Sequence, residues 1–261
     1  LQNLSDSQIE ENQVKELNRL SVSYNKMLER LSEAFKIQRQ FTENAAHELR
    51  TPLSLMQVQL DLYNSGKHPD NDADTIQTIK MVTEQNERLS KMVKTLLDMS
   101  ELQTVGRDET IIVNALVDEV LADLEPLAQE KNIKLIGKCK DVNMVGSDIL
   151  IYRLVYNLVE NAIKYNHSGG QVSVEAYQRE KQVYLSVKDT GNGIPEELKE
   201  RVFEPFFRVD KSRSRELGGV GLGLAFVNEI VRVHDGSIAI RPNPSGGTII
   251  EVQFAVNRTT A

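Results

Sequence analysis

The chain has 261 residues, of which 40% are hydrophobic and 26% are charged, and its 31 basic and 38 acidic residues give a net charge of −7. This length predicts one large or two ordinary domains with a sizeable core, and the acidic balance argues against nucleic acid or an anionic membrane as a direct partner. A single cysteine, Cys139, excludes an intrachain disulfide and fits a reducing compartment. No apolar run is long enough to cross a bilayer, and the sequence shows no signal peptide.

The first hundred residues have a helical pattern. Apolar residues recur at alternating spacings of three and four from Leu17 to Ala34, as in the seam of a coiled coil. Between Phe41 and Leu53 three successive steps of four break the heptad, a stutter that locally unwinds a coiled coil. A turn is predicted at 64–72, followed by a second helical pattern that ends near Gly106. We expect a helical hairpin that buries its apolar face in a dimeric four-helix bundle.

From about residue 108 the pattern changes to strand-like stretches with helices between them. Strands are expected at 110–113, 133–139, 142–145, 171–177, 182–189, 237–240 and 247–254. Helices are expected at about 115–131, 147–165 and 221–235. The strands gather late in the chain and pair as neighbours, which predicts helices layered on a mixed sheet. The expected fold is therefore multidomain, an N-terminal coiled coil and hairpin followed by an α/β sandwich.

A histidine on the first helix is the first candidate for chemistry. At about 100° per residue, His47 points away from the apolar stripe and toward solvent. Glu48 could accept a proton from one ring nitrogen and leave the other as a nucleophile, and Thr51, one turn on, could hold a water. Pro52 lacks an N–H group, so the helix can bend beside this face. The alternative is an incidental surface histidine; a metal site is unsupported because no second ligand has a suitable spacing.

Three later patterns suit a phosphorylated ligand. Asn157, Asn161 and Lys164 share one helix face near Glu160, a set that suits hydrated Mg²⁺ and phosphate. The segments "DTGNGIPEE" (189–197) and "GGVGLGL" (218–224) place glycines where backbone N–H groups can approach phosphate, although neither fits a Walker loop or a Rossmann fingerprint. Arg208 and the basic residues after it could clamp a polyphosphate. Taken singly, these patterns also fit a polar helix face, ordinary turns and an exposed charged loop.

Five segments together resemble the boxes of sensor histidine kinases, in the order found in that family: "HELRTPL" (47–53), "NLVENAIKY" (157–165), "DTGNGI" (189–194), "FEPFFR" (203–208) and "GGVGLGL" (218–224). Residues 11–31 resemble the second helix of a HAMP linker. The resemblance implies a HAMP-like linker with a signalling coiled coil at 1–35, a dimerisation and phosphotransfer hairpin at 36–105, and an ATP-binding catalytic domain at 107–257. It also implies the cytoplasmic portion of a membrane-spanning receptor, with no membrane contact in this chain.

The resemblance further implies ATP-dependent autophosphorylation of His47, with Glu48 as its acid/base partner, and transfer to an aspartate of a response-regulator receiver domain. Thr51 matches the position that aligns water for a phosphatase reaction on that regulator. Asn157 and Asn161 would hold Mg²⁺. The other implied ATP contacts are Lys164 near phosphate, Tyr165 and Thr248 at the adenine pocket, Asp189 on the adenine amino group, Gly191 and Gly193 at close approach, Arg208 in the lid, and Gly219, Gly221, Leu222 and Gly223 at the phosphates.

The departures from the family pattern are modest. Val220 replaces a threonine, and Asp235 replaces a glycine at a position where Asp tolerates left-handed geometry. His68, His167 and His234 match no box and are expected in turns or at the surface. Two alternatives remain open: a scaffold that dimerises without catalysis, and an ATPase of the chaperone or mismatch-repair type. His47 on a dimerising hairpin favours the kinase, and the sequence leaves open whether phosphorylation occurs within one subunit or between two.

Overall fold

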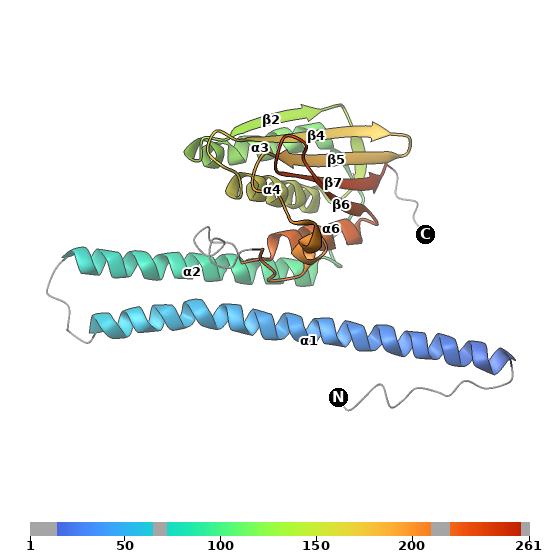
Figure 1. Ribbon diagram of the computed structural model, residues 1–261, viewed down its shortest axis with the longest axis horizontal. Coiled ribbons are helices and arrows are strands. Elements are labelled where there is room, and N and C mark those ends of the chain that lie inside the picture. The colour runs from blue at the N-terminus through green and yellow to red at the C-terminus, as the bar shows by residue number, and fades with distance from the viewer. Residues whose placement is uncertain (1–14, 65–71, 210–219, 257–261) are drawn as a thin grey trace. The chain divides into compact units, whose positions relative to one another are not determined.

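The computed structural model describes residues 15–64, 72–209 and 220–256. The chain divides into two compact units, residues 1–85 and 86–261. The division falls inside the second long helix (Figure 1). Residues 1–14 of the HAMP-like segment, most of the predicted turn at 64–72, and the basic residues after Arg208 lie outside the described residues.

The first unit contains helix α1 (Lys15–Asn64) and the beginning of helix α2 (Asp72–Glu101), which confirms the predicted pair of long helices. Helix α1 continues through Pro52 without interruption, so the lost backbone hydrogen bond does not end the helix. Near the paired helix ends, the Thr75 hydroxyl donates a hydrogen bond of 3.4 Å to the Tyr63 hydroxyl.

Many large apolar side chains of this unit remain exposed. Leu20 and Ile76 are 66% and 65% exposed, and Met27, Leu31, Phe35, Leu53 and Ile79 are also exposed. A series of apolar residues at helical spacing stabilises a protein only when it is removed from water. These faces therefore have the composition expected of a surface that packs against a second copy of the hairpin.

The second unit is built on a five-stranded mixed sheet with the order β2-β4-β5-β7-β6. Its strands are β2 (Lys134–Cys139), β4 (Gln171–Arg179), β5 (Gln182–Asp189), β6 (Ser237–Pro242) and β7 (Thr248–Ala255). Strand β2 is parallel to β4, and the other pairs are antiparallel. The predicted mixed sheet is confirmed, but β7 pairs with both β5 and β6, so pairing between sequence neighbours accounts for only part of the order.

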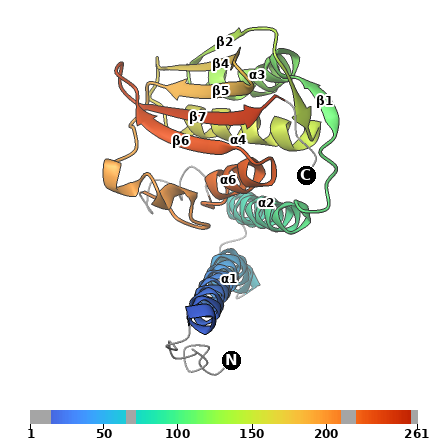
Figure 2. The same ribbon diagram turned by 90° about the vertical axis from the view of Figure 1, so that its right-hand side faces the viewer.

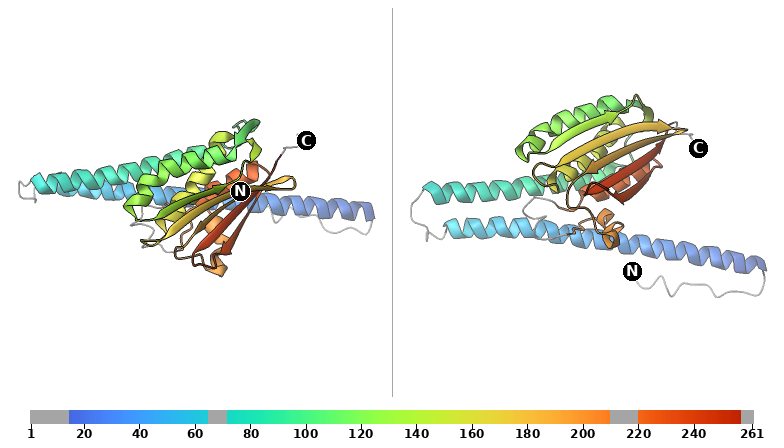
Figure 3. Two further views of the ribbon diagram at one scale, coloured as in Figure 1. Left: turned by 90° about the horizontal axis from the view of Figure 1, so that it is seen from above. Right: turned by 45° about the horizontal axis from the view of Figure 1, so that its top comes forward.

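A short antiparallel pair, β1 (Glu109–Ile112) and β3 (Asn143–Gly146), lies beside the main sheet. Helices α3 (Val113–Glu130), α4 (Asp148–Lys164) and α6 (Gly223–Val233) cover one face of the sheet (Figure 2). Two short 3₁₀ turns, η2 (Glu196–Leu198) and η3 (Arg201–Phe203), precede the stretch at 210–219. The strands fan out with the usual twist (Figure 3).

The core lies between this sheet and its helices because both contribute a regular apolar face. Strand residues alternate, so Val172, Val174 and Ala176 of β4 are buried while their neighbour Glu175 points to the other face. Helix α4 buries Leu150, Ile151, Leu154, Val155 and Leu158 at helical spacing. The same helix thereby leaves its polar residues on a separate face.

His234 lies in the turn that follows α6, in agreement with one of the two expected places, but its side chain is buried at 4% exposure. Its Nδ1 lies 2.8 Å from the Ile230 carbonyl oxygen, and its Nε2 accepts a hydrogen bond of 3.1 Å from the Ser147 backbone N–H. A neutral ring protonated at Nδ1 satisfies both contacts and joins the end of α6 to the start of α4. Asp235, by contrast, adopts the expected left-handed conformation, with φ of 54°.

The buried face of α4 predicts a large effect for one core truncation. Leu154→Ala removes a fully buried side chain and should lower the free energy of unfolding by about 3 kcal/mol. Ile149→Ala on the same helix changes a side chain that is 55% exposed and should cost less than about 1 kcal/mol. Urea denaturation followed by circular dichroism measures both, and equal losses would contradict this description of the core.

Candidate functional site

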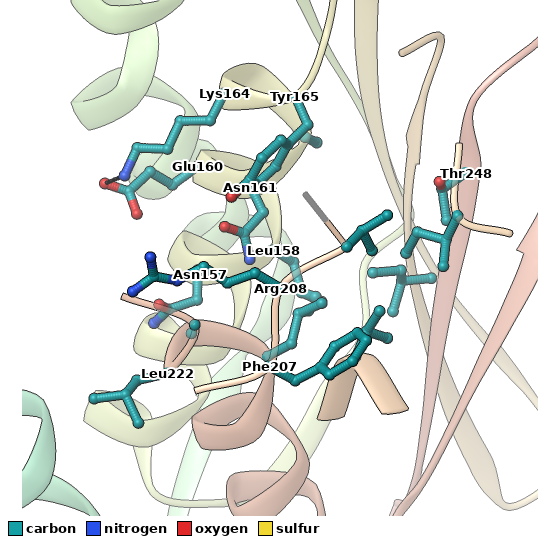
Figure 4. A pocket seen from close by; sticks show the side chains of 18 of the residues that line it. Asn157, Leu158, Glu160, Asn161, Lys164, Tyr165, Phe207, Arg208, Leu222 and Thr248 are labelled. Atoms are coloured by element: carbon teal, nitrogen blue, oxygen red, sulfur yellow. Dashed lines mark ion pairs between the residues drawn. The ribbon is translucent and has the colours of Figure 1, made fainter. Parts of the chain in front are cut away.

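A cavity of about 410 Å³ opens beside α4, and it is lined from several segments far apart in the sequence (Figure 4). Its size falls within the range of small-molecule sites. The lining contains most of the predicted ligand contacts: Asn157, Asn161, Lys164, Tyr165, Asp189, Gly193, Arg208, Gly221, Leu222, Gly223 and Thr248. Of the others, Gly191 lies outside the lining, and Gly219 lies outside the described residues.

One end of the cavity is organised around the carboxyl group of Asp189 at the end of β5. Its Oδ1 accepts backbone hydrogen bonds from Gly191 at 2.8 Å and from Thr248 at 3.2 Å. Burial raises the pKa of the Asp189 carboxyl, and these two N–H groups offset part of that rise because they favour the charged form. Both contacts use Oδ1, so Oδ2 is available to accept from an amino group of a ligand.

Glycines allow the backbone to close tightly around this carboxylate. A Cβ atom at Gly191 would lie 2.5 Å from the Tyr165 carbonyl oxygen, and one at Gly247 would lie 2.3 Å from the Asp189 carbonyl oxygen. Gly247 also has a φ of 88°, which side chains rarely adopt. Any larger residue at either position would displace the loop that carries Asp189.

Two residues that support Asp189 were missed by the sequence analysis. The Asn243 amide donates a hydrogen bond of 2.6 Å to the Asp189 carbonyl oxygen, and Gly247 provides the close approach described above. Both lie in the turn "NPSGG" between β6 and β7. The glycine pair was a visible turn signal, and the resemblance implied that Thr248 lies at the adenine pocket, but no pattern identified Asn243 and Gly247 as supports of Asp189. That role follows from the pairing of β7 with β5.

The opposite end of the cavity combines asparagine amides with the N-terminus of α6. The Asn157 Nδ2 donates to the Arg153 carbonyl oxygen at 2.7 Å. This contact holds the amide oxygen toward Gly223, where a Cβ atom would lie 3.2 Å from Oδ1. Backbone N–H groups in the first turn of a helix lack intrahelical partners and favour anions. This end therefore suits a phosphate group.

A charged cluster lies beside these amides on the next turn of α4. The Lys164 ammonium is 2.9 Å from Glu160 Oε1, and Lys91 of α2 is 3.0 Å from the same oxygen. Burial alone would raise the pKa of the Glu160 carboxyl, but Lys164 and Lys91 outweigh it and the pKa lies below its ordinary value. Burial lowers the pKa of Lys164, and Glu160 offsets part of that effect.

Residues 206–208 are hydrogen-bonded to residues 220 and 221, which precede α6. The Phe206 N–H donates to the Gly221 carbonyl oxygen at 2.8 Å, and the Arg208 guanidinium donates to the Val220 carbonyl oxygen at 3.2 Å. A Cβ atom at Gly221 would lie 2.7 Å from the Phe207 carbonyl oxygen, which explains the glycine. Arg208 is thereby held at the lining of the cavity.

His47, Glu48 and Thr51 belong to the other unit, on α1. His47 and Thr51 are exposed, as the helical pattern predicts, and Glu48 is half-buried. The Thr51 hydroxyl donates to the His47 carbonyl oxygen at 3.2 Å, which fixes its orientation on this face. The histidine is therefore accessible to a reaction partner.

Comparisons with known proteins agree with both halves of this description. Residues 37–105 match the His Kinase A (phospho-acceptor) domain, and residues 146–258 match the histidine kinase-, DNA gyrase B-, and HSP90-like ATPases. The chain belongs to the sensor histidine kinases. It therefore carries the helical phospho-acceptor domain and the ATP-binding domain of that family. A HAMP domain is not among these matches, so the HAMP-like segment stays a prediction.

Among its relatives, this histidine kinase is 32% identical over 247 residues to the signal transduction histidine-protein kinase ArlS of Staphylococcus aureus. The match covers 92% of this chain and 53% of ArlS, so the chain spans about half the length of that relative. Two solved structures, each 25% identical, are similar in fold. Histidine kinase AdeS of Acinetobacter baumannii has a TM-score of 0.67, over 81% of this chain and 98% of that one. Histidine kinase ThkA, solved with the response regulator protein TrrA, has a TM-score of 0.71, over 94% of this chain and 68% of that one.

Within the part of the chain that the structure describes, no helix is both long and apolar enough to cross a membrane. No group of three or more His, Cys, Asp or Glu side chains suited to a metal ion occurs there either.

The support of Asp189 by Asn243 predicts a measurable change in ATP affinity. Asn243→Ala removes the hydrogen bond to the Asp189 carbonyl oxygen and should weaken ATP binding about fivefold to tenfold, the value of one such bond. Ser245→Ala, in the same exposed turn, is the matched control and should change affinity less than about twofold. Isothermal titration calorimetry measures both, and an unchanged affinity in Asn243→Ala would show that the turn does not position Asp189.

Proposed function

We propose that this histidine kinase phosphorylates itself on His47 with ATP and transfers the phosphoryl group to an aspartate of a separate response regulator. The observation that carries the proposal is the convergence of distant segments on one cavity. That cavity has a buried carboxylate at one end, for the adenine amino group, and cations with a helix N-terminus at the other, for the phosphates. The exposed histidine on a separate helical unit supplies an acceptor.

The ATP contacts follow from this arrangement. Asp189 Oδ2 accepts a hydrogen bond from the adenine amino group. Tyr165 and Thr248 border the base, and Gly191 and Gly193 allow its close approach. Lys164, Arg208 and the N–H groups at Gly221, Leu222 and Gly223 surround the phosphates. The resemblance implies the same role for Gly219, which lies outside the described residues. Asn157 and Asn161 would hold Mg²⁺, since their amide oxygens suit a hydrated hard cation. That ion supplies charge neutralisation for the phosphates when bound.

His47 is the nucleophile of the proposed reaction. One ring nitrogen forms a bond to the γ-phosphorus of ATP, the bond from that phosphorus to the bridging oxygen breaks, and ADP leaves. The proton of the attacking imidazole passes to Glu48, which is the adjacent carboxylate. The phosphoimidazole then donates its phosphoryl group to an aspartate oxygen of the regulator. Thr51, exposed one turn along the helix, would align water for a phosphatase reaction that removes the phosphoryl group from that regulator.

The proposal also includes the partners. The exposed apolar faces of α1 and α2 support a homodimer through a four-helix bundle. The solved complex of ThkA with TrrA supports a response regulator as the acceptor. We further propose that residues 1–35 form a HAMP-like linker and coiled coil, residues 36–105 the phosphotransfer hairpin and residues 107–257 the catalytic domain. In that arrangement the chain is the cytoplasmic portion of a membrane receptor.

Labelling with γ-labelled ATP tests the phosphorylation site. The wild-type chain should acquire an acid-labile, base-stable label, and His47→Gln should lose it completely because the acceptor nitrogen is removed. His167→Gln is the matched control, since that exposed histidine belongs to no box, and it should be labelled like the wild type. Label that persists in His47→Gln would refute the assignment.

Replacement of the ATP contacts tests the catalytic side separately. Asn161→Ala and Asp189→Asn should each reduce labelling by at least about a hundredfold, because each removes a contact to ATP or its metal. Both variants should remain dimeric in size-exclusion chromatography, since neither residue lies in the hairpin. Steady release of phosphate from ATP without a phosphoenzyme would instead indicate an ATPase.

A further inference from the structure

The C-terminal half of α2 is attached to α4 by two ion pairs with matching spacing. Lys91 and Asp98 lie seven positions apart on α2, and their partners Glu160 and Arg153 lie seven positions apart on α4. Seven residues make about two helical turns. The first residue on α2 pairs with the last on α4, so the helices run antiparallel, and the opposite polarity of the two pairs favours one register.

Apolar contacts fix the same segment to the second unit. Met92, next to Lys91, is fully buried and lines the cavity together with Thr95. Leu102, just after α2, is 2% exposed and belongs to the core of the domain. The division of the chain at residues 85 and 86 agrees with this assignment. Residues 91–102 are therefore part of the nucleotide-binding unit, although the sequence places them in the hairpin.

The ion pair at Lys91 lies at the phosphate end of the cavity and is unbalanced in charge. Two ammonium groups, from Lys91 and Lys164, share the single carboxylate of Glu160. The Glu160 and Lys164 side chains are 12% and 19% exposed, so their charges are screened less than surface charges, whereas the Lys91 side chain is 62% exposed and can turn toward a ligand. An anion in the cavity would offset the excess positive charge. Glu160 and Thr248 lie on opposite sides of the cavity (Figure 4), so an adenine held at Asp189 would direct its phosphates toward Lys91.

We propose that Lys91 is a nucleotide-binding residue supplied by α2, which contacts the terminal phosphate of ATP and makes the site prefer ATP to ADP. This inference rests on the proposed function and adds a residue of α2 to the proposed ATP site. Because the contact requires α2 in its docked register, ATP binding and docking of α2 stabilise each other. The coupling is reciprocal, so whatever holds α2 on α4 also tightens ATP binding.

Nucleotide titrations of the full chain test the contact. Lys91→Met should weaken MgATP binding about tenfold and MgADP binding less than about threefold, since a charged hydrogen bond to the terminal phosphate is lost. Lys94→Met is the matched control, an exposed lysine three residues on in the same helix with the same change of charge. It should bind both nucleotides like the wild type. Lys91 has a side chain 62% exposed, so its replacement leaves the fold intact, as circular dichroism would verify.

A charge exchange at the other ion pair tests the role of docking. The Asp98 and Arg153 side chains do not line the cavity, so we expect their replacement to affect ATP through the position of α2. Asp98→Arg and Arg153→Asp should each weaken MgATP binding about threefold to tenfold, and the double variant should restore it because the pair is re-formed with reversed polarity.

The outcomes separate the two proposals. Two results would overturn the role of Lys91 and α2. One is that Lys91→Met binds MgATP and MgADP with the same affinities as the wild type. The other is that the single Asp98 and Arg153 variants bind MgATP normally. Such a result would leave the kinase assignment intact. Failure of the wild-type chain to bind MgATP at all would instead refute the proposed function.

Discussion

The position of Asp189 is the constraint on which the ATP site depends. Its carboxylate is buried, and a buried charge persists only where hydrogen bonds replace the lost water. Those bonds come from the loop after β5 and from the first residue of β7, with Asn243 holding the adjacent carbonyl. Three segments must therefore meet within hydrogen-bond distance, which requires β7 to lie beside β5 and glycine to stand at 191 and 247. The order of the strands in the sheet and the geometry of the site therefore both follow from the meeting of these three segments at Asp189.

Helix α4 supplies the polar side chains that make the two ends of the cavity chemically different. Its apolar face is buried in the core, and its polar face carries Asn157, Glu160, Asn161 and Lys164 along one side of the cavity. Tyr165, directly after the helix, lines the cavity as well, while the asparagines face the N-terminus of α6. A ligand that is neutral at one end and anionic at the other matches this gradient. A rigid helix supplies most of the polar groups, so their spacing is set before any ligand binds.

Periodicity predicted the parts of the structure that depend on local sequence. Among the described residues, the two long helices, strands β1 to β7 and helices α3, α4 and α6 lie close to their expected ranges, and most of the box residues outside the first helix meet in the cavity. What failed depends on long-range pairing. His234 lies in a turn as expected, but its burial was not foreseen because its partner, the Ser147 N–H, lies 87 positions away. Asn243 had no visible role because the placement of β7 between β5 and β6 is a property of the whole sheet.

Helix α2 shows why a boundary drawn from sequence differs from one drawn from packing. The helical pattern runs without a break to the end of the hairpin, yet Met92 and the ion pairs of Lys91 and Asp98 place the second half of α2 with the ATP-binding domain. A continuous helix transmits rotation along its length because each turn is hydrogen-bonded to the next. The two units are thus joined by a stiff element with charged pairs at its docked end. Under the proposed function, a rearrangement of the hairpin would act on the ATP site by changing the fit of α2 on α4.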